Sequence, residues 1–239
     1  MKKIILLSIV SILLFANCIF DGDDNKDDNG NQMSVENYLP STLNGSKFTL
    51  HSTKGEAIAS VHDTLTYAVT ISGPVTMDGH EYYTMVSTDN SETGKFCVEA
   101  NSIYLCVEEF MFPEVGNNPD TPFGTNVKLI DFSASPGDSY DILEWGTTND
   151  EYHINYTVSG EFVGYETVQT PYADFEDCAK FQIQIDAQLT PVVSGGVINT
   201  SHIESLWFAP DTGVVKRSIM DNSGFMLYFT DEVLIAFNR

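Results

Sequence analysis

The chain has 239 residues, of which 34 are Asp or Glu and 11 are Lys or Arg, so its formal net charge is −23. This acidity excludes nucleic acid and anionic membrane surfaces as electrostatic partners, because both attract cationic protein. It favours solubility, divalent cations or a cationic partner instead.

Residues 1–17 form a signal peptide rather than part of the fold. Lys2 and Lys3 precede an apolar run over residues 4–15, which is too short to span a bilayer comfortably. The segment closes with Phe15-Ala16-Asn17-Cys18, which resembles the lipobox of bacterial lipoproteins. That resemblance implies that Cys18 is acylated (palmitate included) and becomes the new N-terminus. The membrane is then a partner through this lipid, and the predicted location is the bacterial cell envelope, at the outer membrane or cell surface.

Residues 18–34 carry the lipidated Cys and an acidic stretch without apolar periodicity, which is typical of a flexible tether. The stretch also contains a weak match to a calcium-binding loop. Its ligand positions would be taken by Asn25, Asp27, Asn29 and Glu36. Gly30 stands at the required turn, but Gln32 occupies the place where an apolar residue normally docks. The tether is therefore the favoured interpretation.

Residues 35–239 form one predicted domain of short alternating runs between turn signals. We expect strands over residues 47–50, 64–72, 81–88, 126–133, 141–145, 151–159, 160–169, 180–189, 201–209 and 225–236, with a hairpin over 94–109. The clearest run is 180–189, in which Phe181, Ile183 and Ile185 alternate with polar residues. No stretch has a helical period. The fold class is therefore all-β: a single antiparallel, strongly curved sheet or half-barrel of roughly 11–13 strands, with a sandwich as the alternative.

The hairpin over residues 94–109 predicts a disulfide. A two-residue turn at Asn101-Ser102 would place Cys97 directly opposite Cys106. The pair would be of the close, non-hydrogen-bonded kind, with Cα atoms about 4.5 Å apart. We expect a Cys97–Cys106 bridge unless the register slips by one residue and separates the thiols. Cys178 would then be a lone, buried thiol.

No catalytic motif stands out in the sequence. There is no nucleophile elbow, phosphate loop, dinucleotide fingerprint or zinc-binding His-Glu-x-x-His. Asp211-Thr212-Gly213 is the tripeptide of aspartic proteases, but those enzymes need two copies. Pro210 in front of it favours an ordinary turn. A non-enzymatic protein with no catalytic residues and no cofactor is the favoured interpretation.

Several short motifs between residues 35 and 220 point to one family. They are Tyr38-Leu39-Pro40 with Asn44-Gly45, Pro136-Gly137-Asp138-Ser139, Glu166-x-Val168-x-Thr170-Pro171 with Phe175-x-x-Cys178-x-Lys180, and Trp207-Phe208-Ala209-Pro210 with Gly213-Val214-Val215-Lys216. Together they resemble a family of uncharacterised bacterial lipoproteins built from an antiparallel sheet. Some relatives look similar to the half-barrels of lipoprotein carriers, whose concave side is apolar. The resemblance brings no catalytic residues with it.

The anchor, the tether and the aromatic-rich strands favour an envelope lipoprotein that binds an apolar ligand or a protein partner. Within that interpretation, aromatic side chains that simply fill the core are the more ordinary expectation. Two alternatives remain open: a surface hydrolase acting on envelope polymers, and a calcium-stabilised adhesion or structural protein.

Overall fold

The computed structural model describes residues 33–56, 62–77, 79–88, 93–107, 125–148, 151–222 and 227–238. In these ranges one short helix, α1 (Val35–Tyr38), precedes twelve strands. The strands are β1 (Lys47–Glu56), β2 (Asp63–Met77), β3 (His80–Ser87), β4 (Thr93–Glu99), β5 (Ser102–Val107), β6 (Thr125–Asp131), β7 (Ser139–Thr148), β8 (Tyr152–Gln169), β9 (Asp174–Pro191), β10 (Ile198–Ala209), β11 (Gly213–Asn222) and β12 (Leu227–Asn238).

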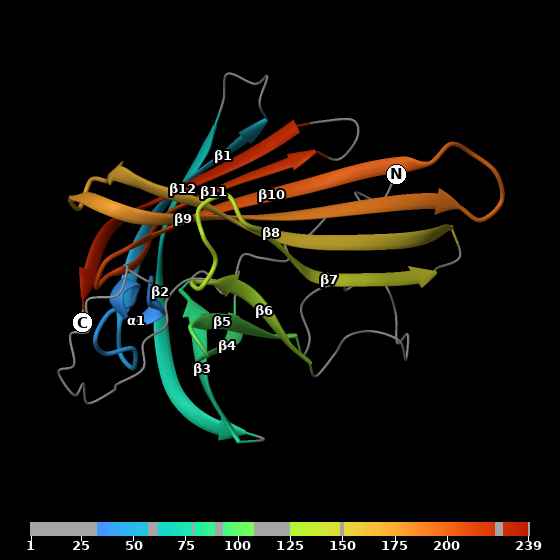
Figure 1. Cartoon of the computed structure of the whole chain (residues 1–239). Coiled ribbons are helices and arrows are strands. Elements are labelled where there is room, and N and C mark those ends of the chain that lie inside the picture. Colours follow the sequence, from blue (N-terminus) through green and yellow to red (C-terminus); the bar gives the residue numbers. More distant parts are fainter. Residues whose placement is uncertain are drawn as a thin grey trace.

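All twelve strands belong to one antiparallel sheet, in the order β6-β5-β4-β3-β2-β1-β12-β11-β10-β9-β8-β7. The sheet bends so that β4–β6 turn back beneath β8–β10 (Figure 1). Its two edge strands approach each other at one end, where the Tyr140 hydroxyl donates a hydrogen bond to the Leu129 carbonyl (3.0 Å). The predicted all-β fold, with a single strongly curved sheet, is confirmed. The sandwich alternative is wrong, because no second sheet forms within the described ranges.

The concave face of the sheet is filled by the chain's own aromatic side chains. The ring of Phe181 lies 5.0 Å from that of Phe132 and 4.9 Å from that of Phe162, measured between centroids. Phe208 lies 5.3 Å from Phe132 and completes the group. All four side chains are fully buried, and such rings contribute large apolar areas to a core. The predicted alternation on β9 is confirmed, since Phe181 and its inward neighbours are buried while the intervening polar residues are not.

The segment over residues 33–43 fills one end of this curved sheet. Val35 N donates to the Asn101 side-chain oxygen (2.6 Å), and Asn101 Nδ2 donates to the Met33 carbonyl (2.8 Å). Tyr38 packs against Phe132, with ring centroids 5.7 Å apart. Met33, which sequence reasoning assigned to the tether, is buried in this core. The chain therefore enters the domain through its interior rather than along its surface.

The β4–β5 hairpin has a register that differs from the predicted one. Its turn residues are Ala100 and Asn101, with φ of 47° and 63°, so the turn comes one residue early. Such paired positive φ values form the hairpin turn that follows the twist of the strands, and Asn tolerates them well. Cys97 consequently lies opposite Tyr104, and Cys106 pairs with Lys95.

The direct pairing behind the predicted disulfide is therefore wrong, because the partner position has moved by two residues. Diagonal neighbours in a sheet have Cα atoms about 7–8 Å apart, beyond the usual disulfide range. The side chain of Cys106 lies outside the described residues, so the Cys97–Cys106 bridge stays a prediction. Cys178 is buried, as expected, and burial raises the pKa of its thiol to about 11.

Asn101 adopts the positive φ of the turn, and its side chain also forms hydrogen bonds to the backbone of residues 33–35. Substitutions can separate these two roles. Glycine suits a positive φ, so Ala100→Gly should be neutral or stabilise the fold by up to about 1 kcal/mol. Asn101→Gly keeps the turn but removes both hydrogen bonds to the 33–35 backbone, and should cost about 1–3 kcal/mol. Urea unfolding of the two variants measures the difference, and equal stabilities would contradict the role of Asn101 in holding this segment.

Candidate functional site

Four ionisable side chains point into the curved sheet, among residues that otherwise form the core. His202 and Glu204 lie on the same face of β10 as Leu206 and Phe208. Arg217 on β11 and Glu232 on β12 complete the set, and each of the four is at most 2% exposed. Charged groups are rarely buried to this degree unless they are paired, so the four, called here the charged layer, form the first candidate site.

Arg217 is the centre of the charged layer. Its Nε donates to Glu204 Oε1 (2.7 Å), and its Nη1 donates to Glu232 Oε2 (3.0 Å). The register explains this geometry, because Glu232 lies directly opposite Arg217 on the neighbouring strand. One guanidinium thus joins β10, β11 and β12 by charge-assisted hydrogen bonds. Removing one member of such a buried set would leave another charge without a partner, which is strongly destabilising.

His202 extends the layer toward the open end of the sheet. Its Nδ1 is hydrogen-bonded to Asp221 Oδ1, and its Nε2 lies 3.8 Å from Glu204 Oε2. Burial alone would lower the pKa of His202, but the hydrogen bond to Asp221 and the nearby negative charges of Asp221 and Glu204 outweigh it and raise the pKa to about 9. The imidazole is therefore protonated at neutral pH and acts as a second buried cation.

Some polar atoms in and beside the charged layer have no hydrogen-bond partner among the described residues. They are Ser52 Oγ, Thr200 Oγ1, His202 Nε2 and Glu204 Oε2. Buried polar atoms of this kind are usually satisfied by internal water molecules. The acids and bases of the layer contact one another and are closed to solvent. Their arrangement suits cross-linking of strands better than chemistry on an external substrate.

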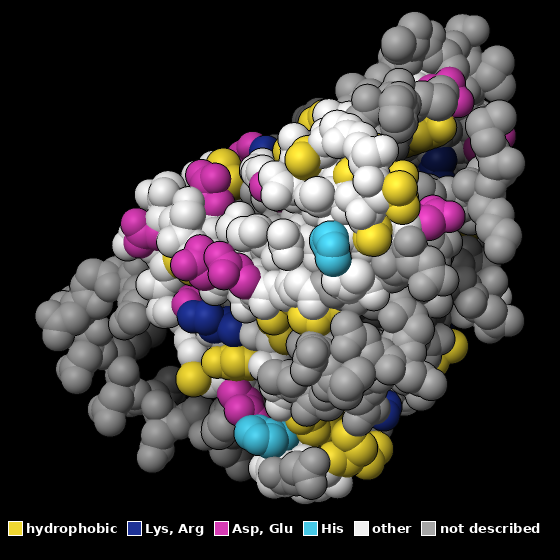
Figure 2. Space-filling model, turned by 90° about the vertical axis from the view of Figure 1, so that its right-hand side faces the viewer, with side chains coloured by type: hydrophobic (Ala, Val, Ile, Leu, Met, Phe, Trp, Pro, Cys, Tyr) yellow, Lys and Arg dark blue, Asp and Glu magenta, His cyan; other side chains and the backbone are white. Residues whose placement is uncertain are grey.

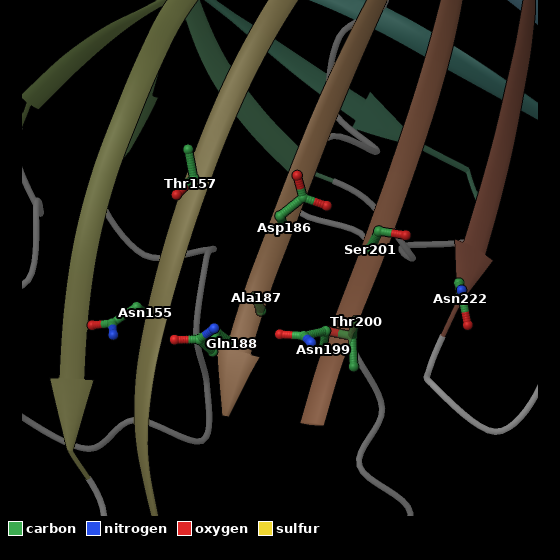
Figure 3. Close-up of a pocket in the computed structure, with 9 residues that line it drawn as sticks. All are labelled: Asn155, Thr157, Asp186, Ala187, Gln188, Asn199, Thr200, Ser201 and Asn222. Atoms are coloured by element: carbon green, nitrogen blue, oxygen red, sulfur yellow. The ribbon is translucent and has the colours of Figure 1, made fainter. Parts of the chain in front are cut away.

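A second candidate site lies on the outer face of the sheet, as a pocket of about 460 Å³. Figure 3 shows that its side chains project from neighbouring strands β8 to β11. The lining residues are Asn155, Thr157, Asp186, Ala187, Gln188, Asn199, Thr200, Ser201 and Asn222. Amides and hydroxyls dominate this polar groove, and Asp186 is its single charged side chain. Such groups can donate and accept hydrogen bonds to a polar partner.

Residues from four of the family-like motifs meet on the outer face near the Ala209 end of β10. The ring of Trp207 lies between two ammonium groups, with Lys180 Nζ 4.7 Å and Lys216 Nζ 4.5 Å from its centroid. Trp207 Nε1 also donates a hydrogen bond to the carboxylate of Glu166. These contacts cover the indole and join β8 to β11 by cation–π and ionic attraction, so the motif residues have a structural role.

The sequence-predicted site residues have different outcomes. Cys18, Asn25, Asp27 and Asn29 lie outside the described residues, so lipidation and the calcium loop stay predictions. Glu36 is exposed on α1, and the described part of the chain holds no group of three or more metal-ligating side chains. Asp211 lies in a tight turn, as expected. No helix in the described ranges is long and apolar enough to cross a membrane.

The charged layer predicts a specific pH dependence of stability. A folded-state pKa raised to about 9 means that His202 contributes its stabilisation fully below its unfolded pKa of 6.5 and loses it as pH rises through 9. The loss should be on the order of 3 kcal/mol for the native chain. His202→Gln should lack this fall, whereas the exposed His153→Gln should retain it. Urea unfolding between pH 6 and pH 10 tests this, and parallel curves for all three chains would contradict it.

Comparison with known proteins finds solved structures of low similarity to this chain. Neither family models nor curated proteins match the chain. Among solved structures, a predicted lipoprotein from Parabacteroides distasonis ATCC 8503 is similar with TM-score 0.47 and 15% identity, over 84% of this chain and 98% of that one. A predicted exported protein with a YmcC-like fold from Bacteroides fragilis NCTC 9343 has TM-score 0.44 and 16% identity, over 84% and 99% of the two chains.

Proposed function

We propose that the chain is a lipid-anchored lipoprotein of the bacterial cell envelope, at the outer membrane or cell surface, and that it binds a protein partner through its outer face. The proposed anchor is an acylated Cys18, which follows from the signal peptide and the lipobox-like residues in front of it. Burial of acyl chains is worth roughly 0.8 kcal/mol per methylene, so a multiply acylated Cys would hold the domain at the membrane.

The packing of the concave face carries this proposal. Phe132, Phe162, Phe181 and Phe208 contact one another there, and the 33–43 segment occupies the end of the sheet. In a lipid carrier these surfaces would face the ligand. Here they form the hydrophobic core of the domain itself. This supports a partner on the outside over an apolar ligand within the sheet.

The burial of the charged layer supports binding over hydrolysis. Glu204 and Glu232 are the acids that a hydrolase would need near a scissile bond, but both are fully buried and bound to Arg217. A polymer cannot reach a carboxylate without access from solvent. The charged layer is therefore better explained as a structural cross-link between strands of the sheet.

The outer surface of the sheet presents polar groups that could form hydrogen bonds to a partner. The polar groove offers amides and hydroxyls from four adjacent strands, which remain in fixed register. Figure 2, which faces the end of the sheet on the right of Figure 1, shows Asp and Glu side chains at several places and Lys or Arg at fewer. A partner with a basic rim around a polar centre would match both features, because complementary charge steers association.

The anchor is tested by Cys18→Ala, which removes the acylated residue. The variant should be released from membranes into the soluble fraction, since no acyl chain can then be attached at this position. Fractionation of cells expressing both chains, with Cys178→Ala as the control thiol, measures the difference. If the Cys18→Ala chain stays in the membrane fraction and is released only by detergent, the proposed lipid anchor at Cys18 is wrong.

The nature of the ligand is tested by native mass spectrometry of the released Cys18→Ala chain. The proposal expects the mass of the polypeptide alone, because the concave face is already packed. The same sample is then analysed under denaturing conditions. A stoichiometric lipid-like mass that is lost on denaturation would contradict the proposal and favour an apolar carrier.

A further inference from the structure

The hairpin between β9 and β10 ends in an exposed apolar tip. Val193 is 90% exposed, and Val192 and Val197 are about half exposed. The tip is defined here as residues 191–197. It is held in place at its base, where Val192 N donates to the Glu151 carbonyl (2.9 Å). Large exposed apolar residues gathered on one protruding element are uncommon in soluble domains and mark a contact surface.

The tip is also free of charge in a strongly acidic chain. Residues 187–203 contain no Asp, Glu, Lys or Arg, although the whole chain has 34 acidic residues. The β8–β9 hairpin at the other end of the sheet differs in this respect. It exposes the carboxylates of Glu166, Asp174, Glu176 and Asp177. The β8–β9 hairpin thus carries several exposed carboxylates, whereas the tip itself is uncharged and the exposed Glu151 lies at its base.

A lipid surface is within reach of the tip if the proposed anchor holds. Asp211 N donates to the Asn37 carbonyl (2.9 Å), so the described start of the chain lies near the Ala209 end of β10. The tip lies at the opposite end, and Figure 1 shows α1 and the β9–β10 hairpin far apart along the sheet. The 12 residues of β10 span about 40 Å. Residues 18–32 of the predicted 18–34 tether could span at most about 50 Å if fully extended. A domain lying along the membrane can thus be anchored through the tether at one end and touch the membrane with the tip at the other.

We propose that the 191–197 tip inserts into the bilayer that carries the anchor, as a second and purely apolar contact; this rests on the proposed lipid anchor. Three valines bury too little area to hold a protein at a membrane alone. Attachment through the tether raises the effective concentration of the tip at the surface, so a weak contact suffices. With the lipid anchor at one end and the tip at the other, the long axis of the sheet lies parallel to the membrane. This orientation determines which strands face away from the membrane.

The test places a tryptophan in the tip. Val193→Trp and, on the acidic hairpin, Tyr172→Trp are prepared in the full lipidated chain and reconstituted in phosphatidylcholine vesicles with and without brominated acyl chains. Tyr172 is 47% exposed and provides the matched control. The natural residues Trp145 and Trp207 are at most 8% exposed and give a constant background. The proposal expects a blue shift and a several-fold larger loss of emission for Val193→Trp than for Tyr172→Trp.

The outcomes are distinguishable. Equal loss of emission from both variants on a vesicle-bound chain overturns the tip contact and leaves the anchor standing. A blue shift without quenching by brominated lipid, together with a dimeric mass, assigns the tip to self-association and overturns the proposal. Failure of the chain to bind vesicles, with Cys18 unmodified by mass, overturns the anchor and the tip contact with it. Adding Val192→Asp to the Val193→Trp chain should reduce the difference between brominated and ordinary vesicles while the chain stays bound.

Discussion

The pairing of β1 with β12 is the constraint on which the domain depends. It joins the first and last strands in the middle of the sheet, with Lys47 opposite Asn238. The chain otherwise forms two meanders, β1–β6 and β7–β12, in which each strand pairs with its neighbour in sequence. Only the β1–β12 seam makes them one sheet. Pairing across such a long sequence separation forms late and slowly, so the seam is the step most exposed to failure in folding.

The charged layer lies beside this seam. Glu232 is opposite Arg217 on one side and opposite Ser52 of β1 on the other. Replacing the buried ions by well-packed apolar side chains would often be tolerated thermodynamically. Ions in a fixed pattern, however, penalise every register that would separate Arg217 from its carboxylates. The layer thereby specifies how β10, β11 and β12 align, where apolar side chains would tolerate slippage.

The sequence was a good guide to single strands such as β9, although the two strands expected over residues 151–159 and 160–169 form one strand, β8. Alternation on β9 identifies Phe181 and Ile183 as inward-facing because a strand with one buried face has a period of two. The same rule places Arg217 between inward-facing Val215 and Ile219, so the layer was within reach of the pattern. The sequence analysis nevertheless missed the charged layer. An ionisable residue at an inward-facing position can be interpreted as part of a buried ion pair only when its partner is known. The partners of Arg217, Glu204 and Glu232, belong to other strands.

The remaining differences come from tertiary contacts. The turn falls on Ala100 and Asn101 because Asn101 also binds the backbone of Met33 and Val35, a contact between segments far apart in sequence. The polar groove needs the register of four strands before its residues become neighbours. Both depend on alignment between strands, which local patterns of hydrophobicity leave undetermined.

The entry of the chain through the end of the sheet has a mechanical consequence. If Cys18 is held in a membrane, any pull on the domain is transmitted along the tether to Met33. The first bonds under tension are the two that Asn101 makes, and behind them lies the packing of Tyr38 on Phe132. The 33–43 segment would therefore peel away before β1, which is paired on both sides, begins to separate. A pulling force at the attachment point would therefore detach the 33–43 segment first. This would expose the aromatic core at one end while the strands of the sheet stay paired.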